Sequence, residues 1–316
     1  MNSTISTLTN QLRQLKPMQI RLLAEIHETG GLGLAADRIG IAQPAASRLM
    51  AEMEELLGVP LREKQGRGIR LTEVGTALAR RALRIQIELA DAARDIVEAA
   101  SGRVGVVRVG SVTGPALSMV LPALTSLQET NPDLRAEVTV ATSVVLCQLL
   151  REGRLDFALA RPDADDDEFE ARLVANEPVS LAVRRGHPLL LQPRITEADL
   201  MKYDWIMGDD STLLTQTVLD RLADLRLPIP PRRISTPSFL FTLALINQSD
   251  SIAPLATPVV SSFAGNPSIP FVTLPIDLGL SVKPFSFVTR AGSRLTPAAR
   301  LLAAAILPDG VPYSPA

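Results

Sequence analysis

Ile41-Ala42-Gln43-Pro44-Ala45-Ala46-Ser47-Arg48 is the stretch that decides the fold of the first part of this 316-residue chain. Pro44 suits the first turn of a helix, and the apolar residues around it leave Gln43, Ser47 and Arg48 on a separate face. Glutamine can bond adenine, serine can bond a base or a phosphate, and arginine can bond guanine or a phosphate. An ordinary solvated helix face is the alternative, but the surrounding sequence favours DNA binding.

Two further helices are predicted before this segment. From Pro17, apolar residues recur along one face until Gly30-Gly31, a shorter pattern is closed by Gly40, and the third helix begins near Gln43. The apolar positions are Met18, Leu22 and Ile26, then Leu32, Ala35, Ala36 and Ile39, then Ala46, Leu49, Met53 and Leu56 or Leu57. Three helices joined by glycine-bearing turns predict a helix-turn-helix.

The stretch from Val59 to Leu71 is expected to form a β-hairpin wing. Its tip, Gln65-Gly66-Arg67-Gly68, is punctuated by glycine and flanked by apolar residues. Residues 62–70 carry Arg62, Lys64, Arg67 and Arg70 against the single acid Glu63, although the formal net charge of the whole chain is −2. A small basic footprint at a hairpin indicates contact with nucleic acid.

Residues 73–103 are expected to form one long linker helix after a DNA-binding domain at 1–72. No proline interrupts this segment, and an apolar stripe runs through Leu78, Ile85, Leu89 and Ile96. Because so long a stripe has no compact partner nearby in sequence, we expect it to pack against a second copy of the chain in a dimer or tetramer. Packing on its own domain is the alternative.

After Gly102 the patterns alternate between strand and helix, which predicts an α/β domain at 104–316. The first unit is a parallel βαβαβ arrangement with strands at 104–109, 134–141 and 155–160. A second set has strands at 179–183, 205–207, 232–235, near Ile252 and at 271–274. By analogy with periplasmic binding proteins, the strand at 285–289 and the helix at 296–307 return to the first unit. Two lobes follow, about 104–178 with 284–308 and about 179–283.

Composition favours a cytoplasmic protein of more than one domain. No run approaches the ~18 apolar residues of a membrane span, and Met1 to Leu15 lack an apolar signal-peptide core. The single Cys147 and the two histidines, His27 and His187, cannot assemble a metal site. No metal, cofactor or membrane contact is expected.

Three segments, 35–48, 54–61 and 66–75, resemble the signature of the LysR-type regulators. Length, domain order and the linker helix also match that family. The resemblance implies a winged helix-turn-helix oligomer that binds promoter DNA and responds to a small-molecule effector, with RNA polymerase as a candidate further partner. It matches Gln43, Pro44, Ser47 and Arg48 to major-groove residues and Arg67 to a wing arginine that reaches the minor groove.

This sequence departs from the family pattern in three places. Serine or threonine is usual where Gly33 and Ala42 stand, so two side-chain helix caps are expected to be missing, at a cost of about 1 kcal/mol each. Arg62 replaces the usual wing phenylalanine, which removes packing at the base of the wing. With Arg70, it is expected to add a phosphate contact.

Hydroxyls at strand ends are the candidate effector ligands. Ser111 and Thr113 follow the first strand of the α/β domain, and Thr142 and Ser143 follow the second. Ligands of open α/β sheets bind at such carboxyl ends, although helix capping is an equal alternative. Arg161 follows the third strand and either faces the cleft or pairs with the acidic loop at 163–168. The hydroxyls favour a sugar or a small carboxylate as effector.

Other reactive residues are assigned structural roles. His187 lies in a turn and is interpreted as a surface histidine, Cys147 as a small core residue, and the acidic run as a solvated loop. Two other functions remain as alternatives. A solute-binding protein would need an export signal, and an α/β enzyme would need a nucleophile with a base or a cofactor fingerprint. Neither feature is present, so a non-enzymatic regulator is expected.

Overall fold

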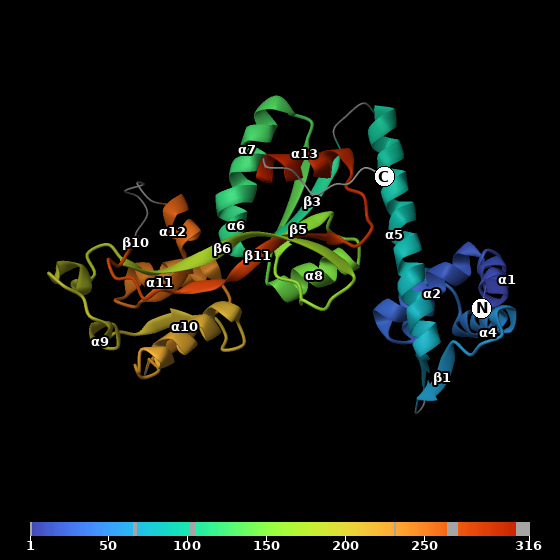
Figure 1. The fold of residues 1–316 in the computed structure, drawn as a ribbon, viewed down its shortest axis with the longest axis horizontal. Coiled ribbons are helices and arrows are strands. Elements are labelled where there is room, and N and C mark those ends of the chain that lie inside the picture. The colour runs from blue at the N-terminus through green and yellow to red at the C-terminus, as the bar shows by residue number, and fades with distance from the viewer. Residues whose placement is uncertain (1, 66–67, 102–104, 231, 264–270, 308–316) are drawn as a thin grey trace. The chain divides into compact units, whose positions relative to one another are not determined.

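The computed structural model describes residues 2–65, 68–101, 105–230, 232–263 and 271–307 (Figure 1). The chain divides into two compact units, Met1–Gly102 and Arg103–Ala316. The long linker helix belongs to the first unit. None of the described helices has the length and apolarity needed to cross a bilayer.

The first unit is a winged helix-turn-helix, as predicted. Gly40, with a φ of 76°, closes the second predicted helix in the left-handed region that glycine adopts most readily. The elements are α1 (Asn2–Leu12), α2 (Pro17–Thr29), α3 (Leu32–Ile39), α4 (Gln43–Leu57), β1 (Arg62–Gln65), β2 (Gly68–Leu71) and α5 (Glu73–Ser101). The hairpin pairs Arg62 with Leu71 and Gln65 with Gly68. Helix α1 was not predicted.

One apolar core holds this unit together. Leu22, Leu23 and Ile26 of α2 meet the buried face of α4, and the wing contributes Leu61. On α4 the buried positions are Ala46, Met50, Met53 and Leu57, so Met50 takes the place expected for Leu49, which is only partly buried.

Helix α5 packs within its own unit over its first turns. Ala79 and Ala82 are buried in the core, and Leu78 is partly buried against it. The expectation that the whole stripe lacks a partner in its own domain is therefore corrected at Leu78. Farther along, Ile85, Leu89 and Ile96 are 44%, 59% and 69% exposed.

The second unit is built on a seven-stranded mixed sheet. Its first lobe is the predicted parallel βαβαβ unit, with β3 between β4 and β5. Its elements are β3 (Val106–Ser111), α6 (Thr113–Pro115), the π-helical turn η1 (Ala116–Val120), α7 (Leu121–Thr130), β4 (Arg135–Val140), α8 (Ser143–Arg151) and β5 (Phe157–Ala160). Helix α13 (Pro297–Ile306) returns to this lobe, where Leu302 and Ala303 share a core with Val107 and Phe157.

The second lobe is centred on buried Trp205, whose indole N–H donates to the Leu200 carbonyl at 3.1 Å. Its parallel strands β7 and β8 pair Trp205 with Arg233. The elements are the 3₁₀ turn η2 (Pro188–Leu191), α9 (Glu197–Leu200), β7 (Trp205–Met207), α10 (Leu213–Asp224), β8 (Arg233–Ser235), α11 (Phe239–Gln248), β9 (Ala253–Ala256), α12 (Thr257–Ser262) and β10 (Phe271–Thr273).

Two long strands, β6 (Phe169–Arg184) and β11 (Ser281–Arg290), run antiparallel and connect the lobes (Figure 1). Strand β11 also pairs with β5, and the second half of β6 pairs with β9 and β10. The expected return crossing is thus made by β11. Strand β6 begins ten residues before the predicted strand at 179–183, because its first half is largely exposed and carries no apolar run.

Candidate nucleic-acid interface and effector site

Helix α4 presents the predicted base-reading residues at its N-terminus. Gln43, Pro44 and Arg48 are exposed and Ser47 is partly buried, on a face that the buried stripe does not use. Ala42 occupies the N-cap without a side-chain hydrogen bond, as expected. The other cap expectation is wrong, because Gly31 is the N-cap of α3 and Gly33 lies inside that helix.

Arg62, which the sequence suggested as a phosphate contact, is held by protein groups in this structure. Its guanidinium donates from Nε to Glu54 Oε2 at 3.3 Å and from Nη1 to Ser47 Oγ at 3.1 Å. Only 21% of its side chain is exposed. The cause is geometric: Glu54 of α4 lies beside Arg62, the first residue of β1, close enough to pair with it.

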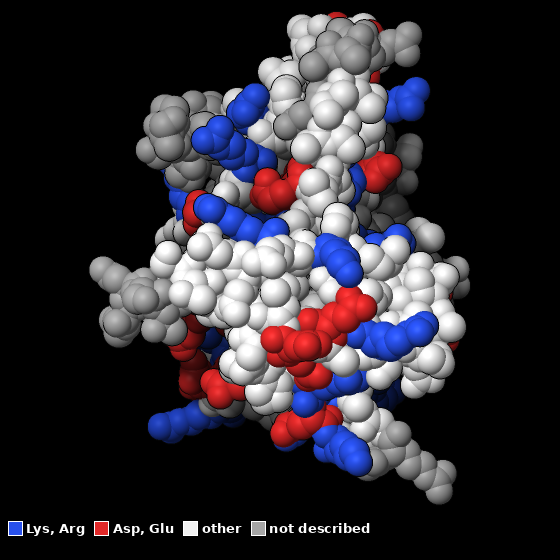
Figure 2. Space-filling model, turned by 90° about the vertical axis from the view of Figure 1, so that its right-hand side faces the viewer, with Lys and Arg blue, Asp and Glu red and all other residues white. Residues whose placement is uncertain are grey.

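The charged residues of the wing other than Arg62 are exposed where the structure describes them, whereas Ile69 and Leu71 pack against the core. Arg70 pairs with Glu63 across the hairpin, and their side chains are 59% and 47% exposed. Arg67 lies outside the described residues. On the face drawn in Figure 2, basic side chains are interspersed with acidic ones and do not form one continuous patch.

The expected effector residues lie in different environments. Thr113 and Thr142 are exposed at the ends of β3 and β4, and neither hydroxyl caps its helix. Ser143 Oγ accepts a hydrogen bond from the Arg161 backbone N–H at 3.1 Å. Ser111 is fully buried and donates to the Val112 carbonyl at 2.9 Å, so it presents no exposed hydroxyl.

Arg161 has a partner that sequence reasoning missed. Its guanidinium forms an ion pair with Glu177 of β6 and donates from Nε to the Lys283 carbonyl of β11 at 2.6 Å. Side-chain exposure is 14% for Arg161 and 8% for Glu177. The expected pairing with the acidic loop is wrong.

That acidic loop pairs instead with Arg151 of α8, which contacts Asp166 at 2.7 Å and Glu168 at 2.5 Å. Ion pairs therefore hold part of this loop in place, so its interpretation as a purely solvated loop is corrected.

The second lobe adds strand-end groups that the sequence analysis did not name. After β7, the Asp209 carboxylate accepts from the Ser211 N–H, which lowers the pKa of Asp209. Thr212 caps α10, and Ser238 after β8 caps α11. The rule that selected Thr142 and Ser143 selects these positions too, once β7 and β8 are known to be parallel.

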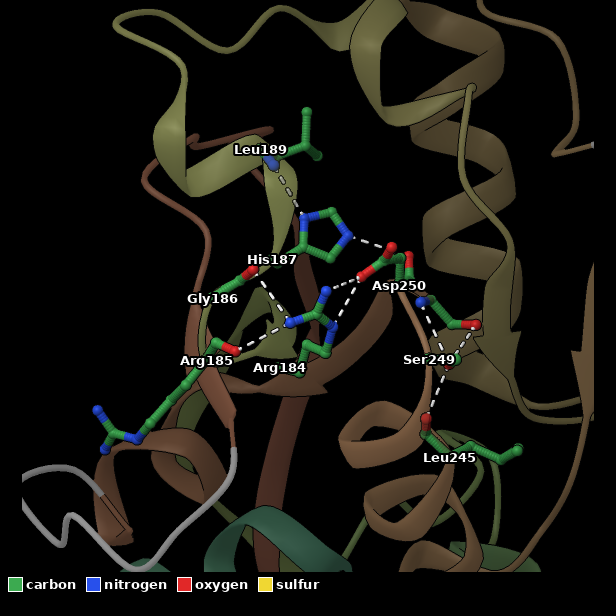
Figure 3. Close-up of polar contacts among 9 residues, drawn as sticks. Arg184, Arg185, Gly186, His187, Leu189, Leu245, Ser249 and Asp250 are labelled. Atoms are coloured by element: carbon green, nitrogen blue, oxygen red, sulfur yellow. Dashed lines mark hydrogen bonds and ion pairs between the residues drawn. The ribbon is translucent and has the colours of Figure 1, made fainter.

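His187 is fully buried, so its interpretation as a surface residue is wrong. Its Nδ1 accepts from the Leu189 N–H at 3.1 Å, and its Nε2 lies 3.0 Å from the Asp250 carbonyl oxygen (Figure 3). Arg184 pairs with the Asp250 carboxylate beside it. Burial lowers the pKa of His187, and the two contacts fit a neutral ring that donates from Nε2.

Cys147 is a buried residue of α8, in keeping with the expected core role. Burial raises the pKa of its thiol to about 11. Because the thiolate is the reactive form, this cysteine is poorly placed for redox chemistry.

Comparison with known proteins gives two family matches. Residues 17–76 match the family described as "Bacterial regulatory helix-turn-helix protein, lysR family", and residues 100–309 match the "LysR substrate binding domain". The chain is 38% identical over 250 residues to the HTH-type transcriptional regulator GbpR of Rhizobium radiobacter, covering 78% of this chain and 83% of the relative. It is 33% identical over 296 residues to GbpR of Azospirillum brasilense, covering 93% and 86%.

Solved structures show the same fold. A full-length OxyR variant from Pseudomonas aeruginosa aligns with a TM-score of 0.60 at 19% identity, over 93% of this chain and 95% of that one. Full-length CbnR complexed with its target DNA aligns with a TM-score of 0.56 at 22% identity, over 93% and 100%.

Proposed function

Because the chain belongs to the LysR family of DNA-binding transcription regulators, we propose that Gln43, Pro44, Ser47 and Arg48 are its major-groove contacts. The observation that carries this proposal is the exposure of Gln43 and Arg48 at the start of α4, opposite the stripe buried in the core. A recognition helix contacts base edges with its N-terminal residues.

The wing supplies backbone contacts in this proposal. Arg70 is exposed and its surface pair with Glu63 is weak enough to open toward a phosphate. We assign Arg67 a minor-groove role on the resemblance alone. Arg62 is left out of the proposed phosphate contacts, since its guanidinium already donates to Glu54 and Ser47.

Self-association completes the DNA-binding unit. We assign the interface to Ile85, Leu89 and Ile96 of α5, whose exposure leaves apolar area that a second copy can cover. Leu78 lies at most at the edge of this interface, since the core of the first unit already covers part of its side chain. A dimer would present two recognition helices to two half-sites.

The effector is proposed to bind beside Thr113, Thr142 and Ser143, at the carboxyl ends of β3 and β4. The exposed hydroxyls of Thr113 and Thr142, with the partly buried hydroxyl of Ser143, suit a sugar or a small carboxylate. The charge of Arg161 is already neutralised by Glu177, which favours the uncharged sugar of the two. A regulatory role without enzymatic activity is proposed, since both GbpR relatives are named as transcriptional regulators.

Two experiments test these assignments. Selection of bound duplexes from a randomised DNA library should enrich a site with two related half-sites, whereas unchanged sequence composition would contradict base reading by α4. A thermal-shift screen of hexoses, pentoses and small carboxylates should find a compound that raises the unfolding temperature in proportion to saturation. That shift should diminish in Thr142→Ala and persist in Thr130→Ala, a matched loss of a hydroxyl at the end of α7.

A further inference from the structure

A polar cluster joins the recognition helix to the base of the wing. Arg62 of β1 donates to Ser47 Oγ at 3.1 Å and to Glu54 Oε2 at 3.3 Å. Its Nη2 also lies 3.4 Å from the Ser47 carbonyl oxygen. The side chains of Arg62 and Glu54 are 21% and 22% exposed. A half-buried arginine fork thus spans two residues of α4 that lie seven positions apart, which is nearly two turns along one face.

Glu54 fixes the other side of the cluster. Its Oε1 accepts the backbone N–H groups of Leu61 at 2.9 Å and Arg62 at 3.1 Å. The same carboxylate therefore holds the first residues of the wing and the guanidinium of Arg62. Charge-assisted bonds of this kind are stronger than neutral ones, so the wing and α4 are oriented as one body.

The bond from Arg62 fixes the hydrogen-bonding role of the Ser47 hydroxyl. Its oxygen accepts from a cation, and within the described part of the chain its hydroxyl donates to no protein acceptor. Its proton is therefore available to the DNA, and the adjacent positive charge strengthens it as a donor. In the major groove the acceptors are guanine N7 and O6, adenine N7 and thymine O4, whereas the cytosine and adenine amino groups are donors.

We propose that Arg62 is a positioning residue that makes Ser47 a hydrogen-bond donor to an acceptor edge in the major groove, and that it is not a phosphate ligand. This inference rests on the proposed placement of α4 in that groove. An apolar side chain at position 62 would leave Ser47 without this partner.

The test compares full-length wild type with Ser47→Ala, Arg62→Phe and the double variant, each selected against a library of randomised duplexes. We expect Arg62→Phe to relax preference about fivefold to tenfold at the base pair that Ser47→Ala also relaxes. The double variant should relax it no further than Ser47→Ala, because the arginine acts through the serine. The slope of log affinity against log salt should stay at the wild-type value in Arg62→Phe.

Three results would overturn the proposal. Arg62→Phe could lower the salt slope by about one unit with its base profile intact, which is the signature of a phosphate ligand. The losses in the double variant could multiply, which would make the residues independent. Ser47→Ala could leave the profile unchanged. Should Arg62→Phe unfold, Arg62→Lys serves instead, since lysine can pair with Glu54 but cannot bridge to Ser47 as a fork.

Failure of this inference is distinguishable from failure of the proposed interface. Gln43→Ala and Arg48→Ala change base preference if α4 reads the groove, whatever Arg62 does. If those two variants also keep the wild-type profile, the placement of α4 is wrong, and the role given to Arg62 is rejected with it.

Discussion

Gly75 of α5 lies directly against the backbone carbonyl of Leu61, at the entry to the wing. A Cβ at position 75 would overlap that carbonyl oxygen, and neither partner is a side chain that can rotate away. The first turn of the linker helix is thereby packed onto the base of the wing.

Gly75→Ala should destabilise the first unit by about 1 to 3 kcal/mol, because inserted volume must displace backbone. Gly33→Ala is the matched control: it also lies in a helix, but its added Cβ would meet nothing closer than 3.9 Å. Alanine there should be neutral or stabilising by up to about 1 kcal/mol. Circular dichroism during thermal unfolding gives the unfolding temperature of each variant. Equal changes in Gly75→Ala and Gly33→Ala would contradict the overlap at Leu61.

Glu177→Ala should destabilise the second unit strongly. Removing one partner of a buried pair leaves the Arg161 charge uncompensated, which costs about 3 to 5 kcal/mol. Arg154→Ala removes one side of a pair whose arginine is 69% exposed and should cost less than about 1 kcal/mol. Fluorescence of Trp205, the single tryptophan, reports the unfolding of both variants in urea. Similar midpoints for the two variants would show that Arg161 and Glu177 are not a buried pair.

His187 should make stability depend on pH. Its pKa in the folded state lies below the ordinary 6.5, so the unfolded chain binds the proton more readily. The stabilisation is complete above the unfolded pKa and is lost as pH falls from about 6.5 toward the lowered folded pKa. His187→Asn cannot titrate, so its unfolding temperature should change less between about pH 7.5 and 5.5 than that of wild type. An identical change in both proteins would assign the dependence to other groups.

Cys147 should resist alkylation in the folded protein. With a pKa of about 11, almost none of the thiol is ionised near neutral pH, and the side chain is only 8% exposed. Iodoacetamide should react in urea but only slowly in buffer. Val144→Cys places a second thiol at a position on α8 that is 81% exposed, and it should react at once. Equal rates at the two positions would mean that α8 does not shield Cys147.

Leu89→Glu should separate the proposed dimer. Leu89 is 59% exposed, and a carboxylate in a helix–helix interface would be buried without a partner. Light scattering coupled to gel filtration should show a smaller mass than for wild type. Glu88→Ala, a neighbouring exposed position on the same helix, should keep the wild-type mass. An unchanged mass in Leu89→Glu would move the interface away from this stripe.

Local signals explain what could be predicted from sequence. The helix-turn-helix follows from short apolar periods closed by glycines such as Gly40, and the wing from a glycine-punctuated tip. Strand β5 of the first lobe follows from a buried apolar run, Phe157–Ala160. Each of these patterns is complete within a few residues, so one sequence suffices to find it.

The missed features depend on contacts between distant residues. Arg161 and the Lys283 carbonyl that it contacts are 122 positions apart, and nothing near Arg161 indicates Glu177. Arg62 and Ser47 are 15 positions apart on different elements, so the sequence indicates the charge of the arginine but not its partner. The first half of β6 is largely exposed and pairs with β11. Because it contains no buried apolar run, its sequence does not indicate a strand.

The most direct test of base reading by α4 measures binding of Gln43→Ala, Arg48→Ala and Arg70→Ala to the selected duplex and to a scrambled duplex over a salt series. Each α4 variant should lose about 1 to 3 kcal/mol on the selected duplex and much less on the scrambled one. Arg70→Ala should weaken both duplexes alike and lower the salt slope by about one unit. If Gln43→Ala and Arg48→Ala weaken both duplexes equally while Arg70→Ala changes base preference, the helix and the wing have the opposite roles.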